Sequence, residues 1–452
     1  DVSEHVIFIR HDYKKVWSDF IIWSLATGSA ARPALFRLAR EIGYNAVYAP
    51  TWDPGIFRSA SVANMYLLAE SGLEHILRAP MKKEDDQLDP CPFNPEQVRT
   101  GLEKVREKAE KFRKYAPVAW ITCQEKGLTR GWWAVDVSFD HWTLAKFREH
   151  LRRKYGTLSA LNRAWATQFK TWDEVMPLKW TEARGRGNYA PWVEFRLFMD
   201  GVFPYAQRLL RETIQSVMPG LPVGPASSPV INPFRGYDPA RISKAVDFFP
   251  EYPHDAHVVA LRPELFKFEI VRSLSRAPKP GMYGSPYCEH NVEHGVWWSA
   301  FHDAGGVAFW TLGTGDGKAR FVHPILAVMQ RGVWLERHTR SLRRGLGKFL
   351  IAARREHDGI AILFHQPNMY VAWIEDKSGR EGTYRCFLES RVAFCHSLEA
   401  LGFQYNFVTM EHVRSGLLPK YRVLVLPFPI ALSLEDLRAV GRFVRDGGMV
   451  IA

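Results

Sequence analysis

Two glutamates lie where the sequence could hold catalytic carboxyl groups. Glu125 follows the apolar run AWITC at residues 119–123, and Glu289 follows the segment GMYGSPYC at residues 281–288. Residues that follow a strand lie on loops that a rigid scaffold positions, and catalytic groups concentrate there. Two carboxyl groups that face each other can flank a glycosidic bond. The protonated group donates to the leaving oxygen, and the ionised group attacks the anomeric carbon.

Aromatic side chains accompany both glutamates. Trp52 follows a predicted strand, Tyr287 lies just before Glu289, and Trp310 ends another predicted strand. Their rings are flat apolar surfaces that suit a sugar ring. We therefore expect these three residues to bind substrate beside the two carboxyl groups.

Each of these residues also has an ordinary interpretation. A glutamate after a strand is most often a solvated loop or helix-capping residue, and Trp310 alone is more often a core residue. Glu251 and Glu293 are competing carboxylates for the role of nucleophile, and Glu293 is expected on the helix that follows Glu289. The combination of carboxylates after two strands with a tryptophan after a third favours a retaining glycosidase.

Strands and helices alternate through the first three quarters of the chain. The predicted strands lie within residues 19–28, 44–53, 63–72, 119–124, 221–229, 245–252, 281–290 and 305–313. Amphipathic helices are expected at 32–43, at 94–116 with an Asn cap and a Pro in its first turn, and at 194–220. This pattern predicts a (β/α)8 TIM barrel over residues 1–345, with a helical insertion at about 138–180. Its carboxyl-end loops would carry Glu125 after the fourth strand and Glu289 after the seventh.

The pattern restarts after residue 356. Short apolar strands are expected within 360–365, 403–409, 421–427 and 447–452, with helices at 390–402 and 433–448 between them. This predicts a doubly wound α/β domain over residues 356–452. It ends on a strand at Ala452, so we expect it to be truncated.

Charge and composition exclude several classes of protein. The net charge is +12, from 60 basic and 48 acidic residues, but both signs mix along the helix patterns, so no nucleic-acid partner is expected. The five cysteines form no CxxC pair, which argues against a zinc site and a disulfide framework. No nucleotide-binding glycine loop occurs, so no cofactor and no metal are expected. No signal peptide or membrane-length apolar run is visible, which favours a cytoplasmic protein without a membrane partner.

The segment 147–175 resembles a specific pattern in glycoside hydrolase family 42, the β-galactosidases. The family pattern is F-x-x-x-L-x-x-x-Y-G-x-x-x-x-L-N-x-x-W-x-T-x-F-x-x-W-x-x-V. The matching residues are Phe147, Leu151, Tyr155, Gly156, Leu161, Asn162, Trp165, Thr167, Phe169, Trp172 and Val175. The segment RGNYAPWVEFRLFM continues the similarity, which is strong from about residue 115 to 200.

The resemblance implies a function for each glutamate. It identifies Glu125 as the acid/base and Glu289 as the nucleophile of a retaining β-galactosidase that uses double displacement. It also implies that residues 356–452 form a glutamine-amidotransferase-like domain that serves assembly, with a homo-oligomer, most simply a trimer, as the result. The expected partner is a glycoside or oligosaccharide substrate.

The sequence departs from the family pattern at three points. The family usually has Asn before its acid/base glutamate, where this chain has Gln124. The resemblance implies that this amide binds the sugar hydroxyl next to the anomeric carbon, and the extra methylene of Gln124 would shift the sugar. The nucleophile region is shorter, and the zinc-binding cysteine cluster of some members is absent. Two alternatives therefore stay open. One is a β-glucanase, cellulase or other β-glycosidase of the same clan, with exo or endo action, and the other is a catalytically silent carbohydrate-binding or assembly protein.

Overall fold

The computed structural model describes most of the chain. The described residues are 19, 21–25, 33–49, 53–77, 91–124, 126–129, 134–226, 232–249, 265–274, 289–309, 312, 321–323, 325–353, 355–376, 383–416, 418 and 420–452. Trp52, Glu125, Glu251, Tyr287 and Trp310 lie outside them.

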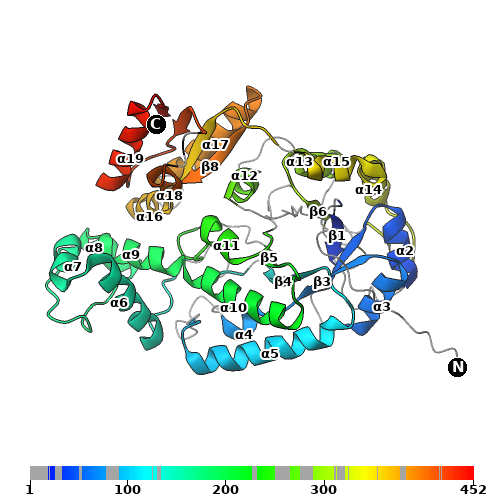
Figure 1. Cartoon of the computed structure of the whole chain (residues 1–452), viewed down its shortest axis with the longest axis horizontal. Helices are drawn as coiled ribbons and strands as arrows, with labels where there is room; N and C mark the ends of the chain where they lie inside the picture. Colours follow the sequence, from blue (N-terminus) through cyan, green and yellow to red (C-terminus); the bar gives the residue numbers. More distant parts are fainter. Residues whose placement is uncertain are drawn as a thin grey trace.

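The first sheet is curled and parallel, as the barrel prediction requires. Its strand order is β5-β4-β3-β2-β1-β6, so neighbours in sequence are neighbours in space until β1 pairs with β6 (Figure 1). The strands are β1 (Ile21–Leu25), β2 (Ala46–Ala49), β3 (Tyr66–Glu70), β4 (Ala119–Gln124), β5 (Val223–Ala226) and β6 (Gly306–Phe309). These six strands correspond to the predicted strands one to five and eight.

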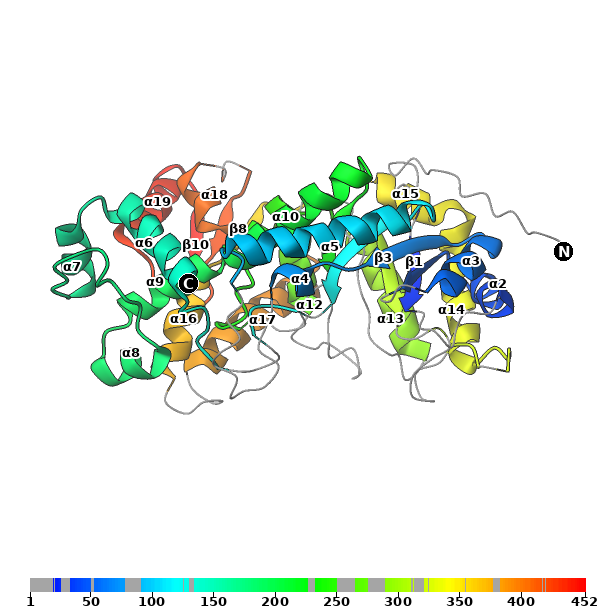
Figure 2. The same ribbon diagram turned by 90° about the horizontal axis from the view of Figure 1, so that it is seen from below.

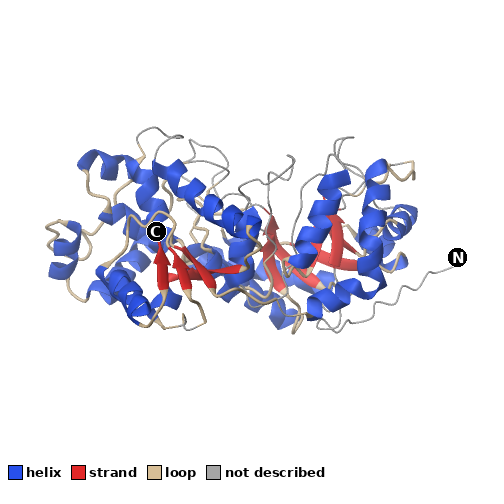
Figure 3. Ribbon diagram, turned by 90° about the horizontal axis from the view of Figure 1, so that it is seen from above, coloured by secondary structure: helices blue, strands red, loops and turns tan. Residues whose placement is uncertain are grey.

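Both faces of this sheet are buried, which explains its nearly continuous apolar strands. Side chains alternate between faces along each strand. Trp23, Tyr48 and Ile121 belong to the inner cluster, whereas Val47 and Trp120 pack outward against the helices. In Figure 3 the strands form a central layer with helices around it.

The helices around the sheet follow local signals in the sequence. Asn94 accepts hydrogen bonds from the N–H groups of Glu96 and Gln97, and Pro95 opens the long helix α5, as predicted. The helices of this part are α2 (Pro33–Glu41), α3 (Pro54–Val62), α4 (Leu73–Ile76), α5 (Pro95–Arg113), α10 (Val202–Val217), α11 (Pro239–Ala245), α12 (Leu265–Leu274), α13 (Glu289–Phe301), α14 (Gln330–Ser341), the π-helical turn η2 (Leu342–Leu346) and α15 (Gly347–Ala352).

Three sequence predictions need correction or completion. The predicted helix 194–220 is in fact two helices, α9 (Ala190–Met199) and α10. The helix is interrupted at Asp200 and Gly201, which lie between them. Residues 246–249 of the predicted sixth strand are not a regular strand, although the N–H of Asp247 donates to the carbonyl of Val223 in β5 at 2.8 Å. Glu289 does not end a strand, since it is the first residue of helix α13. The rest of the predicted seventh strand, 281–288, lies outside the described residues.

The helical insertion forms one end of the molecule in Figure 1. It contains α6 (His141–Tyr155), α7 (Leu158–Trp165), α8 (Trp180–Arg186) and α9 (Ala190–Met199). The family-like residues Phe147, Leu161 and Trp165 are buried in its core. Several residues that carry the family resemblance are therefore core residues of the insertion.

The second sheet is also parallel, with strand order β10-β9-β7-β8. Its elements are β7 (Ile360–Phe364), α16 (Gln366–Glu375), α17 (Thr383–Ala400), β8 (Tyr405–Thr409), α18 (Met410–Arg414), β9 (Val423–Val425), α19 (Leu434–Arg445) and β10 (Met449–Ile451). Each strand matches a predicted one, whereas α16 and α18 have no counterpart in the predictions. In the described part of the chain, no helix is long and apolar enough to cross a membrane.

A buried ionic cluster joins this second unit to the barrel. The carboxylate of Glu269 on α12 contacts Arg272 at 2.7 Å, His302 at 2.5 Å and Arg355 at 3.3 Å. Arg272 also donates to the carbonyl oxygen of Tyr405 in β8 at 2.7 Å. Burial alone would raise the pKa of Glu269, but Arg272 and the other two partners hold it well below its usual range. The paired charges hold Arg272 in place, and its hydrogen bond to the carbonyl of Tyr405 links α12 to β8.

Candidate active site

The segment around Glu125 is held from both sides, although Glu125 itself lies outside the described residues. Gln124 is the last residue of β4 and is half-buried. The ammonium of Lys126 contacts the carboxylate of Glu74 at 3.5 Å, and the N–H of Leu128 donates to the carbonyl of Arg235 at 3.0 Å. Gly127 is required here, because a Cβ would lie 2.9 Å from the same carbonyl oxygen.

A bulge in β4 lies just before this segment. Its pairing with β5 shifts register between Ile121 and Gln124. Thr122 donates to the side-chain oxygen of Gln207 on α10 at 2.6 Å, and Cys123 also faces Gln207, at 3.9 Å. Two successive side chains therefore point to the outer face. Bulges of this kind re-aim the residues that follow them and are frequent beside active sites.

A second carboxyl group lies on the inner face of the neighbouring strand. The hydroxyl of Tyr48 in β2 donates to Oε2 of Glu70, the last residue of β3. Burial raises the pKa of Glu70 to about 7, against the opposing effects of the Tyr48 hydrogen bond and of Lys126. Burial, together with the charge of Glu70, also raises the pKa of Tyr48 well above its usual value. Glu70 also ends an apolar strand, which is the signal that identified Glu125. Glu70 was not identified from the sequence, although this signal could have found it.

The raised pKa predicts that Glu70 makes the stability of the fold depend on pH. Between pH 4.5 and about 7 the folded chain holds a proton that the unfolded chain has lost, so stability falls as pH rises through this window. A shift of this size corresponds to roughly 3 kcal/mol at most. Glu70→Gln should therefore unfold at higher urea than the wild type at pH 8, with a smaller difference at pH 5. Equal pH dependence in wild type and Glu70→Gln would contradict the prediction, and the exposed Glu103→Gln is the matched control.

Glu289 has a defined environment at the start of α13. Its Oε1 contacts the guanidinium of Arg337 at 2.5 Å and Nε2 of His338 at 3.3 Å, both on α14. Its side chain is 35% exposed, and that of Arg337 is 62% exposed. Among the described residues its polar contacts are with α14, not with the end of β4. Glu293 lies one turn further along α13, with a 50% exposed side chain.

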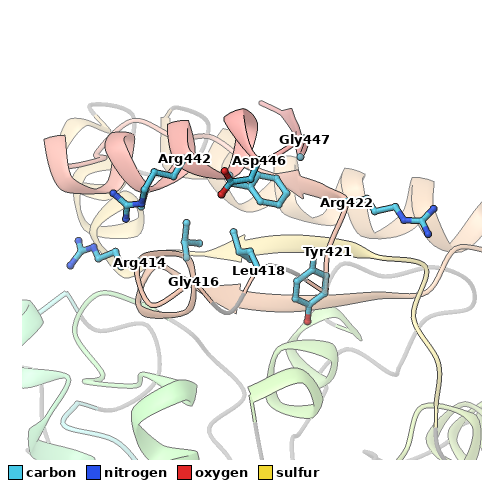
Figure 4. Close-up of a pocket in the computed structure, with 12 residues that line it drawn as sticks. Arg414, Gly416, Leu418, Tyr421, Arg422, Arg442, Asp446 and Gly447 are labelled. Atoms are coloured by element: carbon cyan, nitrogen blue, oxygen red, sulfur yellow. The ribbon is translucent and has the colours of Figure 1, made fainter.

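A cavity of about 410 Å³ lies in the second unit. Arg414, Arg422, Arg442 and Asp446 line it beside Tyr421 (Figure 4). Arg414 is paired with Asp436 and Glu435, and in Figure 4 Arg422 points away from the other two arginines. The cavity lies within the second unit, apart from the barrel. Its arginine side chains do not converge on one point, so it is not a focused anion site. The described residues contain no group of three or more His, Cys, Asp or Glu side chains that could hold a metal.

Known proteins resemble this chain in sequence and in fold. A family model described as Glyco_hydro_42, Beta-galactosidase, matches residues 133–290. The β-galactosidase LacZ of Heyndrickxia coagulans is 21% identical over 383 residues, which are 79% of this chain. This chain spans 54% of the length of that relative.

Several solved structures share the fold. The β-galactosidase from Bacillus circulans sp. alkalophilus has a TM-score of 0.73 at 16% identity, over 96% of this chain and 70% of the other. A GH42 β-galactosidase from G. stearothermophilus has a TM-score of 0.75 at 15% identity, over 96% and 71%. An exo-carrageenase of the same family from Bacteroides ovatus has a TM-score of 0.61 at 11% identity, over 98% and 63%. The barrel fold and the predicted resemblance are thereby confirmed.

Proposed function

We propose that this chain, which resembles the family 42 glycoside hydrolases, is a glycoside hydrolase that cleaves terminal β-D-galactosides. The observation that carries the proposal is the match of the family model to residues 133–290. This segment begins eight residues after Glu125. Glu125 follows Gln124, the last residue of β4, and catalytic groups of barrel enzymes lie after the carboxyl ends of the strands.

The proposed reaction is a double displacement with retention. Glu125 protonates the leaving oxygen, and Glu289 attacks the anomeric carbon to form a covalent glycosyl-enzyme. Glu125 then takes a proton from the water that releases the sugar. The two carboxyl groups must come within roughly 5–5.5 Å in the substrate complex. If Glu289 is not the nucleophile, Glu251 and Glu293 are the next candidates.

The remaining predicted residues bind the substrate in this proposal. Gln124 binds the hydroxyl next to the anomeric carbon, and its extra methylene relative to Asn changes the depth at which the sugar sits. Trp52, Tyr287 and Trp310 provide ring faces for the sugar. Each of these roles is proposed from the sequence and from the position of β4.

A second substrate class is a β-glucan or another β-glycoside, as for a β-glucanase, cellulase or other β-glycosidase of the same clan. Gln124, which stands where the family usually has Asn, is the feature that favours this class. A catalytically silent carbohydrate-binding protein is the third candidate. All three candidates share the fold. They differ in whether the two glutamates are catalytic and, if so, in the sugar on which they act.

Assembly is a separate part of the proposal. We infer that the second unit mediates a homo-oligomer, with a trimer as the expected form, because a unit of this kind serves assembly in the family that the sequence resembles. Sedimentation equilibrium at micromolar protein concentration measures the mass of the assembly directly. A monomeric mass would contradict the inferred homo-oligomer.

One assay separates the three candidates. The wild type should hydrolyse 4-nitrophenyl β-D-galactoside in preference to the glucoside, fucoside and xyloside, and Glu125→Gln should lose hydrolysis of substrates with poor leaving groups. Preference for another β-glycoside would move the assignment to the second class. Sugar binding without turnover of any glycoside in the panel would identify a silent binding protein.

A further inference from the structure

The pair formed by Tyr48 and Glu70 has no role in the proposed reaction, yet it lies inside the barrel. Tyr48 belongs to the inner cluster and is fully buried. Leu68 of β3 also belongs to this cluster, so the alternation along the strand places Glu70 on the same inner face. Glu70 is only partly buried. Because it ends β3, its exposed part lies towards the carboxyl-end opening of the barrel.

Glu70 is next to the segment that carries Glu125. Strands β3 and β4 are paired, with Glu70 opposite Ile121, and the N–H of Ser71 donates to the carbonyl of Ile121 at 3.0 Å. The charge of Glu70 also acts on residues on both sides of Gln124 and Glu125. Lys126 lowers the pKa of Glu70, while Glu70 adds to the effect of burial in raising the pKa of Cys123.

Only one oxygen of the Glu70 carboxyl group is used within the described part of the chain. Oε2 accepts from Tyr48, whereas Oε1 has no hydrogen-bond partner among the described residues. In the same layer, the ring of Trp23 packs edge-on against Tyr48 at 5.7 Å between centroids. The indole N–H of Trp23 is buried and also lacks a partner among the described residues.

Unpaired polar atoms inside a protein carry a desolvation cost, and most of them are satisfied by protein, water or ligand. A sugar hydroxyl both donates and accepts, and a carboxyl oxygen is a strong acceptor for it. The Tyr48 hydrogen bond holds Glu70 in place, so that little conformational freedom would be lost when a hydroxyl binds.

We propose that Glu70, held by Tyr48, is a sugar-binding residue whose Oε1 accepts a hydrogen bond from one hydroxyl of the glycone, the sugar on the non-reducing side of the scissile bond. This inference rests on the proposed function, because it places the glycone in front of Gln124 and Glu125. It adds a contact from β3 to those expected from β4, β6 and the loop after β2.

Binding of non-hydrolysable sugars tests this contact without any turnover. Isothermal titration at pH 8, where Glu70 with its pKa of about 7 is mostly ionised, would measure the affinity of phenyl 1-thio-β-D-galactoside and of its 2-, 3-, 4- and 6-deoxy analogues. For the wild type, loss of the hydroxyl that contacts Glu70 should weaken binding by about 10-fold or more, as for a hydrogen bond to a charged group. Glu70→Gln should weaken binding of the parent sugar by a similar factor and should no longer discriminate against that one analogue.

The variants distinguish a ligand contact from a purely structural role. The glutamine of Glu70→Gln can still accept from Tyr48, so the fold is retained, and circular dichroism checks this. Tyr48→Phe should weaken binding of the parent sugar less than Glu70→Gln does. The double variant should match Glu70→Gln alone, because both changes act through one contact. Glu103→Gln should behave as the wild type.

Each outcome bears on one proposal or the other. Wild-type affinity of folded Glu70→Gln for the parent sugar and for all four analogues would overturn the role of Glu70 and leave the glycosidase proposal intact. Binding without hydrolysis of any aryl glycoside would remove the proposed reaction, while the deoxy series would still decide the role of Glu70. No binding of the thiogalactoside by the wild type would remove the Glu70 contact together with the galactoside pocket.

Discussion

Glu125→Gln is expected to lower kcat on β-galactosides with poor leaving groups by about 100- to 10,000-fold, the usual contribution of general acid catalysis. The glutamine keeps the shape of the side chain but has no proton to give to the leaving oxygen. Aryl leaving groups of low pKa depart without that proton, so 2,4-dinitrophenyl galactoside should retain a near-normal first step. The loss should therefore increase steeply with the pKa of the leaving group.

Azide provides an independent test of the same residue. In Glu125→Ala, a small anion can enter the space of the lost carboxyl group and attack the glycosyl-enzyme without general base help. Added azide should restore turnover and give a β-galactosyl azide, which NMR spectroscopy identifies by its anomeric configuration. Equal losses on all leaving groups, without azide rescue, would remove Glu125 from the role of acid/base.

Glu289→Ala is expected to abolish turnover, by about 1,000-fold or more, with every leaving group, because no covalent intermediate can form without the nucleophile. The loss should not depend on the leaving group, in contrast with Glu125→Gln. A 2-deoxy-2-fluoro galactosyl fluoride should label Glu289 in the wild type, and peptide mass mapping would locate the label.

The ion pair of Glu289 with Arg337 supplies the matched control. Arg337→Gln breaks the contact of 2.5 Å but leaves the carboxylate in place. The pair is part-exposed, with side chains 62% and 35% exposed, so its loss should cost about 1 kcal/mol of stability or less. Arg337→Gln should therefore keep most of the activity. Equal effects of Glu289→Ala and Arg337→Gln would instead assign Glu289 to helix packing, and a label on Glu251 or Glu293 would name the nucleophile.

Local signals predicted much of the secondary structure. Asn94 and Pro95 fixed the start of α5, since the side-chain cap and the missing N–H act within one turn. The apolar runs predicted six strands of the first sheet and all four of the second, because strands buried on both faces are continuously apolar. The insertion was identified through its core residues, of which Phe147, Leu161 and Trp165 are buried.

Predictions failed where neighbours distant in sequence determine the backbone. The pattern of residues 194–220 is apolar on one face throughout, but α9 and α10 pack against different parts of the molecule and the helix breaks at Asp200. Glu289 follows a strand-like segment in sequence, yet it begins helix α13, and its carboxylate contacts Arg337 on α14. Helices α13 and α14 lie side by side in Figure 2. The helices and side chains that determine these two features are distant in sequence, so a short stretch of sequence does not reveal them.

The sequence by itself determined the barrel class, the family resemblance and the position of Gln124 at the end of β4, because periodicity and strand ends are local properties. Only the tertiary structure decided which side chains meet inside the barrel. Tyr48 and Glu70 are 22 residues apart and form a pair because parallel strands β2 and β3 lie side by side. The raised pKa of Glu70 follows from burial, which no single residue determines. It is a property of the assembled sheet.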